Sequence, residues 1–136
     1  MKGEMIVTST DYQRLTDVVE LSAAKTRMPE LVKALLDKLA KARVVPQHEI
    51  NDGIVTMNSK VYLRDTKSGR ETEVTITYPQ EADPRQRRVS IFSEVGLALL
   101  GKGERDIVSW KVPGGIGEFE VVRVTYQPEA AGHFNP

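Results

Sequence analysis

A Pro-Gly-Gly turn at residues 113–115 constrains the fold of this chain more than any other stretch of its sequence. Apolar and polar side chains alternate in residues 106–112 before the turn and in residues 118–126 after it, which is typical of β-strands. Proline fixes its own φ and glycine accepts positive φ, so the chain can reverse sharply at this point. The sequence therefore predicts a β-hairpin. A phosphate-binding loop is disfavoured, because a strand and not a helix follows the turn.

The segments before this hairpin predict more strands and one short helix. Residues 89–93 alternate like a strand, and residues 94–101 form a compact run of Leu and Ala between glycines, which indicates a short buried helix. Further upstream, residues 54–64 and 71–78 predict two strands separated by a polar turn. The order from residue 89 onward is strand, helix, strand, turn, strand.

Two helical segments precede these strands. Thr10 and Gln13 match a capping box for a first helix, and Pro29 suits the first position of a second helix. Because both helices are short and close in sequence, we expect an antiparallel helical hairpin about 20–24 Å long, with its tip at residues 22–28. Apolar residues at helical spacing predict the buried stripe of the second helix: Val32, Leu35, Leu36, Leu39 and Ala42.

The pattern changes from helical to extended at a polar connector near residue 46. We therefore expect an α+β protein of two parts. Residues 1–46 hold a short strand and the helical hairpin, which is predicted to be a coiled coil. Residues 47–136 hold an antiparallel sheet packed on one short helix, and residues 127–136 form a tail that either lies over the sheet or frays.

The composition narrows the classes of function. The 136 residues include 19 acidic and 19 basic side chains, so the total charge predicts no general affinity for nucleic acid. The absence of cysteine excludes disulfides and Cys-based zinc sites, and the two histidines, His48 and His133, fall in the connector and the tail. There is neither a membrane-length apolar run nor a signal-peptide pattern. We expect a cytoplasmic protein with no metal, cofactor, small-molecule substrate or membrane partner.

Four segments carry a resemblance to a known family. They are Val55-Thr56-Met57-Asn58-Ser59-Lys60-Val61, Val95-Gly96-Leu97-Ala98-Leu99-Leu100-Gly101, Pro113-Gly114-Gly115 and Tyr126-Gln127-Pro128-Glu129-Ala130-Ala131-Gly132. The chain resembles the Gre-factor superfamily of proteins that bind the secondary channel of bacterial RNA polymerase. The first and last segments resemble the branch of the regulator of nucleoside diphosphate kinase, and the middle two are shared with the transcript-cleavage factors.

The resemblance implies a carboxy-terminal domain similar to FK506-binding proteins, which docks on the polymerase, and a coiled-coil hairpin directed at the channel. In the cleavage factors, acidic residues at the hairpin tip help to hold a magnesium ion at the polymerase active site. This hairpin is shorter, and its tip has no carboxylate but two cations. The candidate tip residues are Lys25, Thr26, Arg27 and Met28.

The resemblance also implies a docking surface at the start of the short helix, where Phe92, Ser93, Glu94 and Val95 match the positions that contact polymerase. Glu94 stands where the cleavage factors commonly have proline. Phe92 is a candidate anchor if it is exposed, because aromatic residues are enriched at interface hot spots.

We therefore expect a regulator, not an enzyme, that binds bacterial RNA polymerase near the secondary channel and competes with transcript-cleavage factors without cleaving RNA. One alternative is a cleavage factor that uses Glu20 or Glu30 to bind metal, and another is a peptidyl-prolyl isomerase. Loops with basic side chains leave open a weak contact with nucleic acid: Arg85, Arg87, Arg88, Lys102 and Arg105.

Overall fold

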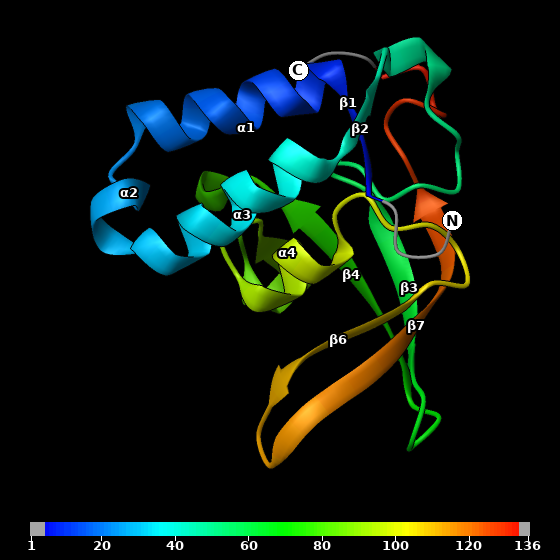
Figure 1. Ribbon diagram of the computed structural model, residues 1–136. Coiled ribbons are helices and arrows are strands. Elements are labelled where there is room, and N and C mark those ends of the chain that lie inside the picture. Colours follow the sequence, from blue (N-terminus) through cyan, green and yellow to red (C-terminus); the bar gives the residue numbers. More distant parts are fainter. Residues whose placement is uncertain (1–4, 134–136) are drawn as a thin grey trace.

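A helical arm occupies the first third of the chain. The computed structural model describes residues 5–133, and its first elements are β1 (Ile6–Thr8), α1 (Ser9–Leu21), α2 (Ala24–Arg27), α3 (Pro29–Lys41) and β2 (Arg43–Val45). We call α1 to α3 the arm. Parallel pairing of β1 with β2 closes one end of the arm, and α2 joins the two longer helices at the other end, its tip (Figure 1). With 13 residues each, α1 and α3 are about 20 Å long.

The first helix begins two residues earlier than its predicted capping box. Thr8 is the N-cap, and its hydroxyl accepts a hydrogen bond from the Asp11 backbone N–H at 2.9 Å. The predicted pair is wrong, because Thr10 Oγ1 instead donates to Gln47 and the Gln13 amide donates to Asp17. The reason is the short strand β1, which keeps the chain extended up to Thr8 and lets the helix start directly after it.

The second long helix is amphipathic, as its spacing predicts. Pro29 occupies its first turn, and Val32, Leu35 and Leu39 are buried. Leu36 is 39% exposed, so it is not part of the buried stripe. Neither this helix nor any other in residues 5–133 has the length and apolar character needed to cross a membrane.

A curled five-stranded sheet forms the rest of the molecule, in the strand order β5-β4-β3-β7-β6 (Figure 1). Its strands are β3 (Lys60–Asp65), β4 (Glu71–Thr77), β5 (Arg88–Ser90), β6 (Ile107–Val112) and β7 (Gly115–Tyr126). Helix α4 (Glu94–Leu99) lies between β5 and β6 in the chain and packs on the sheet. The fold is thus a mixed α+β arrangement, as predicted.

The sheet is not wholly antiparallel. Strands β4 and β5 run parallel, with Ile76 opposite Val89, whereas the other neighbouring pairs are antiparallel. A parallel pair needs a connection that returns the chain to the same end of the sheet. Residues 78–87, which contain two short 3₁₀ helices, Pro79–Glu81 and Pro84–Gln86, make that connection here.

The hairpin at the Pro-Gly-Gly turn forms as predicted. Strands β6 and β7 pair antiparallel, and Gly114 has a φ of +92°, a conformation that other residues adopt only with strain. Next to the turn, the rings of Trp110 and Phe119 stack with centroids 4.1 Å apart. Trp110 therefore has the packing role that its strand position favours.

The strand expected at residues 54–64 starts later, at Lys60. The preceding residues form a tight buried turn instead. Ser59 Oγ accepts from the Thr56 backbone N–H at 2.9 Å, and the Val55 N–H donates to the carbonyl of Lys102. These bonds pair the segment with other loops, so it cannot continue the ladder of β3.

One hydrophobic core joins the arm to the sheet. Buried Leu15 and Leu35 of the arm belong to the same cluster as Leu63 and Ile76 of the sheet and Leu99 of α4. Helix α3 lies between α1 and α4 (Figure 1). The arm is therefore packed against α4 and the sheet.

The tail, up to residue 133, folds back over the loops instead of fraying. The Gln127 side-chain amide donates to the carbonyls of Asn51 and Ile54, both at 2.8 Å. His133 Nδ1 lies 2.7 Å from the Tyr126 hydroxyl. The rest of the predicted tail, residues 134–136, falls outside the described residues.

Candidate functional site

The start of α4 is held rigidly by three serine-centred hydrogen bonds. The Ser93 hydroxyl caps the helix by accepting from the Gly96 N–H at 3.0 Å and donates to the Ser90 carbonyl at 2.7 Å. The Phe92 N–H donates to Ser90 Oγ at 2.9 Å. The backbone of residues 90–96 is thus fixed before any partner arrives, which reduces the entropy lost on binding.

The four docking candidates differ in what they present to solvent. Glu94 is exposed, Ser93 and Val95 are half-buried, and Phe92 is only 6% exposed. Phe92 therefore does not meet the condition for a surface anchor, since its ring packs into the core beneath the loop. The surface available to a partner is the Glu94 carboxylate with Ser93 and Val95 beside it.

Helix α2 forms the tip of the arm. Lys25, Thr26 and Arg27 are exposed, whereas Met28 is half-buried and packs against the core. Lys25 Nζ lies 2.9 Å from Glu20 Oε2, and both side chains are more than half exposed. Solvent and salt screen such a pair, so it contributes little to stability, but it partly neutralises the charge of Lys25.

The carboxylates flanking the tip do not gather into a metal site. Glu20 pairs with Lys25, and Glu30 lies in the first turn of α3 on the other side of α2. Among residues 5–133 no group of three or more His, Asp or Glu side chains is placed to hold a metal ion. An apolar feature that the sequence reasoning missed lies here as well: Leu21, at the end of α1, is 86% exposed.

A second feature that was missed is a buried carboxylate at the base of the arm. Asp11 is 5% exposed, and its carboxylate accepts from the Met57 N–H at 3.1 Å. The pKa of Asp11 is raised to about 7, mainly by burial; the Met57 hydrogen bond opposes the shift, and the charge of nearby Glu129 contributes to it. The sequence signal was present, because Thr8 and Asp11 have the spacing of an N-cap and its acidic partner.

Glu129 of the tail is a second buried carboxylate, and its charge acts on Asp11. It is 9% exposed and accepts from the Thr56 hydroxyl at 2.8 Å. A small pocket of about 170 Å³ lies beside the two carboxylates, and Arg14, Tyr126 and His133 also line it. The base of the arm, the turn before β3 and the tail are thus fastened together by polar contacts.

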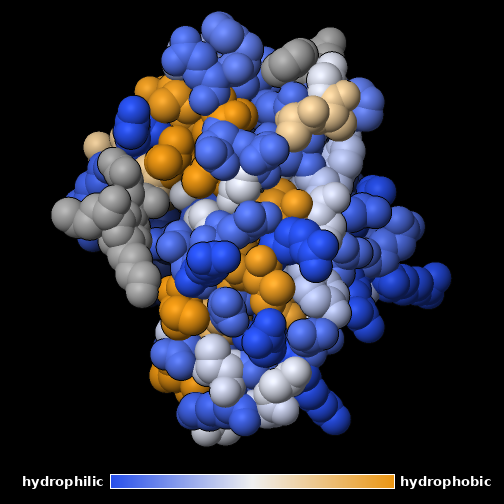
Figure 2. All heavy atoms as spheres, turned by 90° about the vertical axis from the view of Figure 1, so that its right-hand side faces the viewer, coloured by the Kyte–Doolittle hydropathy of each residue, from blue (hydrophilic) through white to orange (hydrophobic). Residues whose placement is uncertain are grey.

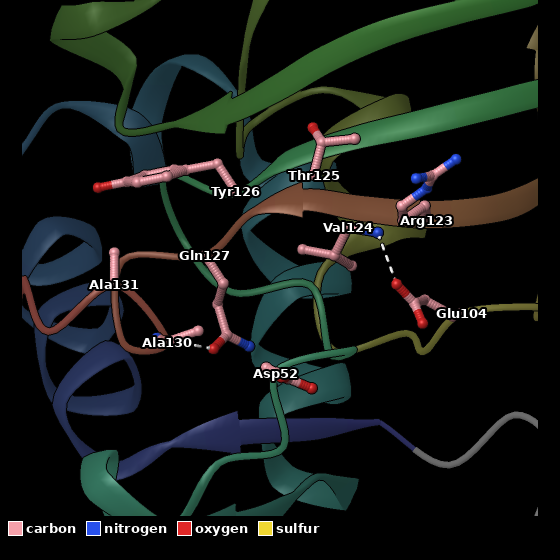
Figure 3. Close-up of a pocket in the computed structure, with 9 residues that line it drawn as sticks. All are labelled: Asp52, Glu104, Arg123, Val124, Thr125, Tyr126, Gln127, Ala130 and Ala131. Carbon is pink, nitrogen blue, oxygen red and sulfur yellow. Dashed lines mark hydrogen bonds between the residues drawn. The ribbon is translucent and has the colours of Figure 1, made fainter.

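A pocket of about 440 Å³ lies between the end of β7 and the tail (Figure 3). Its lining mixes acidic Asp52 and Glu104 with basic Arg123. Glu104 accepts from the Val124 N–H at 3.0 Å, and the Gln127 side-chain oxygen accepts from the Ala130 N–H at 3.1 Å (Figure 3). Both side chains are occupied in holding the backbone, which favours a structural role for this groove. On the face drawn in Figure 2, apolar residues form separate patches among hydrophilic ones.

Comparison with known proteins identifies the family. Residues 50–126 match the family model described as transcription elongation factor, GreA/GreB, C-term. The chain belongs to the GreA/GreB family. Residues 4–45 match the model of the Rnk N-terminus, which confirms the branch that the sequence indicates. The GreA/GreB match contains the start of α4, and the Rnk match contains the whole arm.

Individual relatives agree with this assignment. The chain is 33% identical over 131 residues to the regulator of nucleoside diphosphate kinase of Escherichia coli strain K12, covering 96% of this chain and 95% of the relative. It is 30% identical over 125 residues to transcription elongation factor GreA of Clostridioides difficile strain 630, covering 90% and 79%. A solved structure of a GreA/GreB elongation factor from Nitrosomonas europaea superimposes with a TM-score of 0.76 at 36% identity, over 92% of this chain and 100% of that one.

The names of these GreA/GreB relatives bear on the expected class of function. The Escherichia coli relative is named a regulator, and the Clostridioides difficile and Nitrosomonas europaea proteins are named elongation factors. The expectation of a protein concerned with transcription is therefore supported at the level of the family.

Proposed function

We propose that this protein is a transcription regulator that binds bacterial RNA polymerase near the secondary channel and competes with transcript-cleavage factors without cleaving RNA. The carboxy-terminal domain, residues 47–136, docks on the polymerase, and the arm occupies the mouth of the channel. We also propose that this domain is similar to FK506-binding proteins and that the arm is a coiled coil. The protein is expected to be cytoplasmic.

The observation that carries the proposal is the chemistry of the arm tip. A second magnesium ion at a polymerase active site needs hard oxygen ligands, which carboxylates provide. The exposed side chains of α2 are instead Lys25, Thr26 and Arg27, and two cations raise the electrostatic free energy of a nearby Mg²⁺. Such a tip blocks the channel but brings no metal to the RNA.

The length of the arm supports the same conclusion. Its helices are about 20 Å long, and α3 packs along α4 instead of projecting away from the domain. If the protein docks through the start of α4, the tip stays close to the docking surface. An arm of this kind fills the channel mouth without reaching the active centre.

Equilibrium binding of the full chain to core RNA polymerase tests the docking step. We expect saturable binding at low salt, and we expect Glu94→Lys to weaken it about tenfold, because an exposed interface charge is reversed. Glu81→Lys is the matched control, since Glu81 is also exposed but lies on the loop before β5. No binding by the wild type at low salt would end the proposal.

Two alternatives have direct assays. A cleavage factor would shorten the RNA of backtracked complexes and lose this activity on Glu30→Ala, whereas Glu20 is already engaged by Lys25. A peptidyl-prolyl isomerase would accelerate proline isomerisation in a short peptide. Such enzymes use an aromatic-lined apolar pocket, but the pocket between β7 and the tail has a charged lining, and Trp110 and Phe119 stack on one another.

A further inference from the structure

The two edges of the five-stranded sheet differ in whether their outer side is already bonded. At one edge, the three-residue strand β5 is bonded to the loop before it, because Asp83 and Arg88 exchange two backbone hydrogen bonds, both of 2.9 Å. At the other edge, β6 pairs with β7 alone in the sheet. Strand β6 therefore has an open side, to which a further strand can be added.

The backbone groups on the open side of β6 belong to Ile107, Ser109 and Lys111. The Asp106 carbonyl accepts from the Val121 N–H, so the backbone of Asp106 faces β7. Successive residues of a strand direct their backbone groups to alternate sides, so the backbone of Ile107 faces away from β7, as do those of Ser109 and Lys111. In the part of the chain that the structure describes, these outward N–H and C=O groups have no hydrogen-bond partner.

The side chains of the same three residues lie on the exposed face of the β6–β7 hairpin. Ile107 is 48% exposed, and Ser109 and Lys111 are exposed as well. Ile116 of β7 lies opposite Lys111 on this face and is 58% exposed. A partner that pairs with the backbone of β6 would also cover apolar side chains that now face water, and this burial favours association.

The open side of β6 is accessible from solvent. A pocket of about 230 Å³ lies beside Ile107 and Ser109, so α4 does not fill the space next to the start of the strand. The other end of β6 leads to the Pro-Gly-Gly turn, which lies on the side of the molecule away from the arm (Figure 1). An added strand can therefore approach the whole edge.

We propose that two copies of this protein form a symmetric dimer by antiparallel pairing of β6 with β6 of the second copy. In the register that we propose, Ser109 lies opposite Ser109 of the second copy, and Ile107 lies opposite Lys111 on either side. Each of these three facing pairs exchanges two backbone hydrogen bonds. Because both copies use the same surface, the pairing closes at two copies and joins their sheets into one. This inference goes beyond the proposed function and involves no polymerase.

Charge favours a second copy as the occupant of this edge. In the proposed register no like charges lie directly opposite each other, and the aliphatic part of each Lys111 side chain covers an Ile107 of the other copy. The chain has 19 acidic and 19 basic residues, so two copies do not repel each other through net charge. A single pair of strands makes a small interface, and we therefore expect a weak dimer whose population depends on concentration.

Disulfide cross-linking of the full chain tests the pairing directly, because the sequence contains no cysteine. Position 109 faces itself with Cα atoms about 5.5 Å apart, which is within the range of a disulfide. We expect Ser109→Cys to form a covalent dimer under mild oxidation. Lys111→Cys is the control, since the two copies of this position are separated by four residues along the paired strands, about 13 Å. No covalent dimer from Ser109→Cys, or equal cross-linking of both variants, would overturn the proposal.

Sedimentation equilibrium from about 1 μM to about 1 mM protein measures the dimer without cross-linking. We expect the wild type to change from monomer to dimer in this range. Ser109→Pro removes the central outward N–H and should weaken the dimer at least tenfold, and the fold should persist because proline is tolerated where an edge strand faces solvent. Ser109→Ala keeps this N–H and should associate like the wild type. A wild type that is monomeric throughout, or equal association of the proline variant, would contradict the proposal.

A charge exchange tests the register. Ile107→Lys places two lysines opposite each other at two points of the symmetric dimer, so we expect it to weaken association about tenfold. Adding Lys111→Glu to this variant restores opposite charges at both points and should recover the dimer. Association that is unchanged by the first substitution, or is not recovered by the second, would contradict the proposed register.

The dimer and the proposed function fail in different ways. All of these measurements use the protein alone, so a failure to bind polymerase leaves them unaffected. If the wild type stays monomeric but Ser109→Pro weakens polymerase binding, the edge receives a strand of polymerase and the dimer proposal is wrong. Circular dichroism of each variant monitors folding. If Ser109→Pro does not fold, cross-linking of Ser109→Cys decides the outcome, because cysteine keeps the backbone N–H.

Discussion

At the scale of single residues, Asp11 is the most perturbed acid that the structure describes. Its carboxyl is buried, it faces Arg14 on its own helix, and it lies near Glu129 of the tail and Tyr78 after β4. Burial disfavours the charged form, so the folded protein holds a proton here that the unfolded chain releases at lower pH. The base of the arm is therefore sensitive to pH.

We predict that stability falls as the pH rises from about 4 to about 7. The pKa of Asp11 is about 7 in the folded protein against an ordinary value of 3.8, so the stabilising contribution of the protonated form is complete below pH 3.8 and is lost as the pH rises through 7. The slope from this one group is at most about 1.4 kcal/mol per pH unit. Chemical denaturation of wild type and Asp11→Asn across this range isolates the effect.

The variant should show a flatter stability profile, because an amide has no proton to lose and its oxygen still accepts from the Met57 N–H. Asp17→Asn, which changes an exposed position on the same helix, should keep the wild-type profile. Equal slopes in wild type and Asp11→Asn would show that Asp11 does not carry the pH dependence.

The close approach of α4 to β5 requires a residue without a side chain at position 96. A Cβ atom at this position would lie 2.9 Å from the Ile91 Cα and would collide with the Ser90 carbonyl oxygen. Gly96→Ala should therefore destabilise the fold by about 1–3 kcal/mol, the usual cost of overpacking. Glu94→Ala, at an exposed position of the same helix, should change stability by less than about 0.5 kcal/mol. Thermal and denaturant unfolding of both variants decides this.

At the scale of elements, the start of α1 shows that the local sequence pattern alone does not decide where a helix begins. Both Thr8 and Thr10 can cap a helix, but only Thr8 follows an extended strand and is completely buried. We predict that Thr8→Ala costs about 1 kcal/mol and Thr10→Ala clearly less. Comparing the two unfolding midpoints measures the difference, and a larger loss at Thr10 would place the cap there after all.

Elements that are determined by residues close together in the sequence were predictable. The Pro113 turn, its two strands and the short helix after Ser93 all follow from local spacing and punctuation. The parallel pairing of β4 with β5 was not, because it depends on where a ten-residue connection returns the chain. Turn-forming residues in that connection suggest a loop but do not fix its direction.

In the candidate site, too, the sequence predicts some features and not others. Sequence places Glu94 on the surface at the start of α4, but it cannot show that Phe92, two residues earlier, turns inward. The buried contact between Asp11 and the Met57 N–H joins residues that are 46 positions apart, so no local pattern reveals it. Side-chain direction and long-range contact are tertiary properties.

At the scale of the whole molecule, the arm and the sheet share one core, and the tail is bonded to the turn before β3 that also binds the base of the arm. The tip is thus held at a set distance from the start of α4 and does not swing on a free linker. A partner that binds α4 determines where Lys25 and Arg27 lie. Under the proposed function, this geometry would make the arm a fixed obstruction at the channel mouth.

Transcript cleavage in backtracked elongation complexes tests this obstruction most directly. The protein is added alone, and then in increasing amounts together with a fixed amount of a transcript-cleavage factor. We predict no cleavage by the protein alone and a saturable fall in the cleavage rate of the mixture. Cleavage by the protein alone, or an unchanged rate at saturating concentration, would contradict the proposal that it is a non-cleaving competitor.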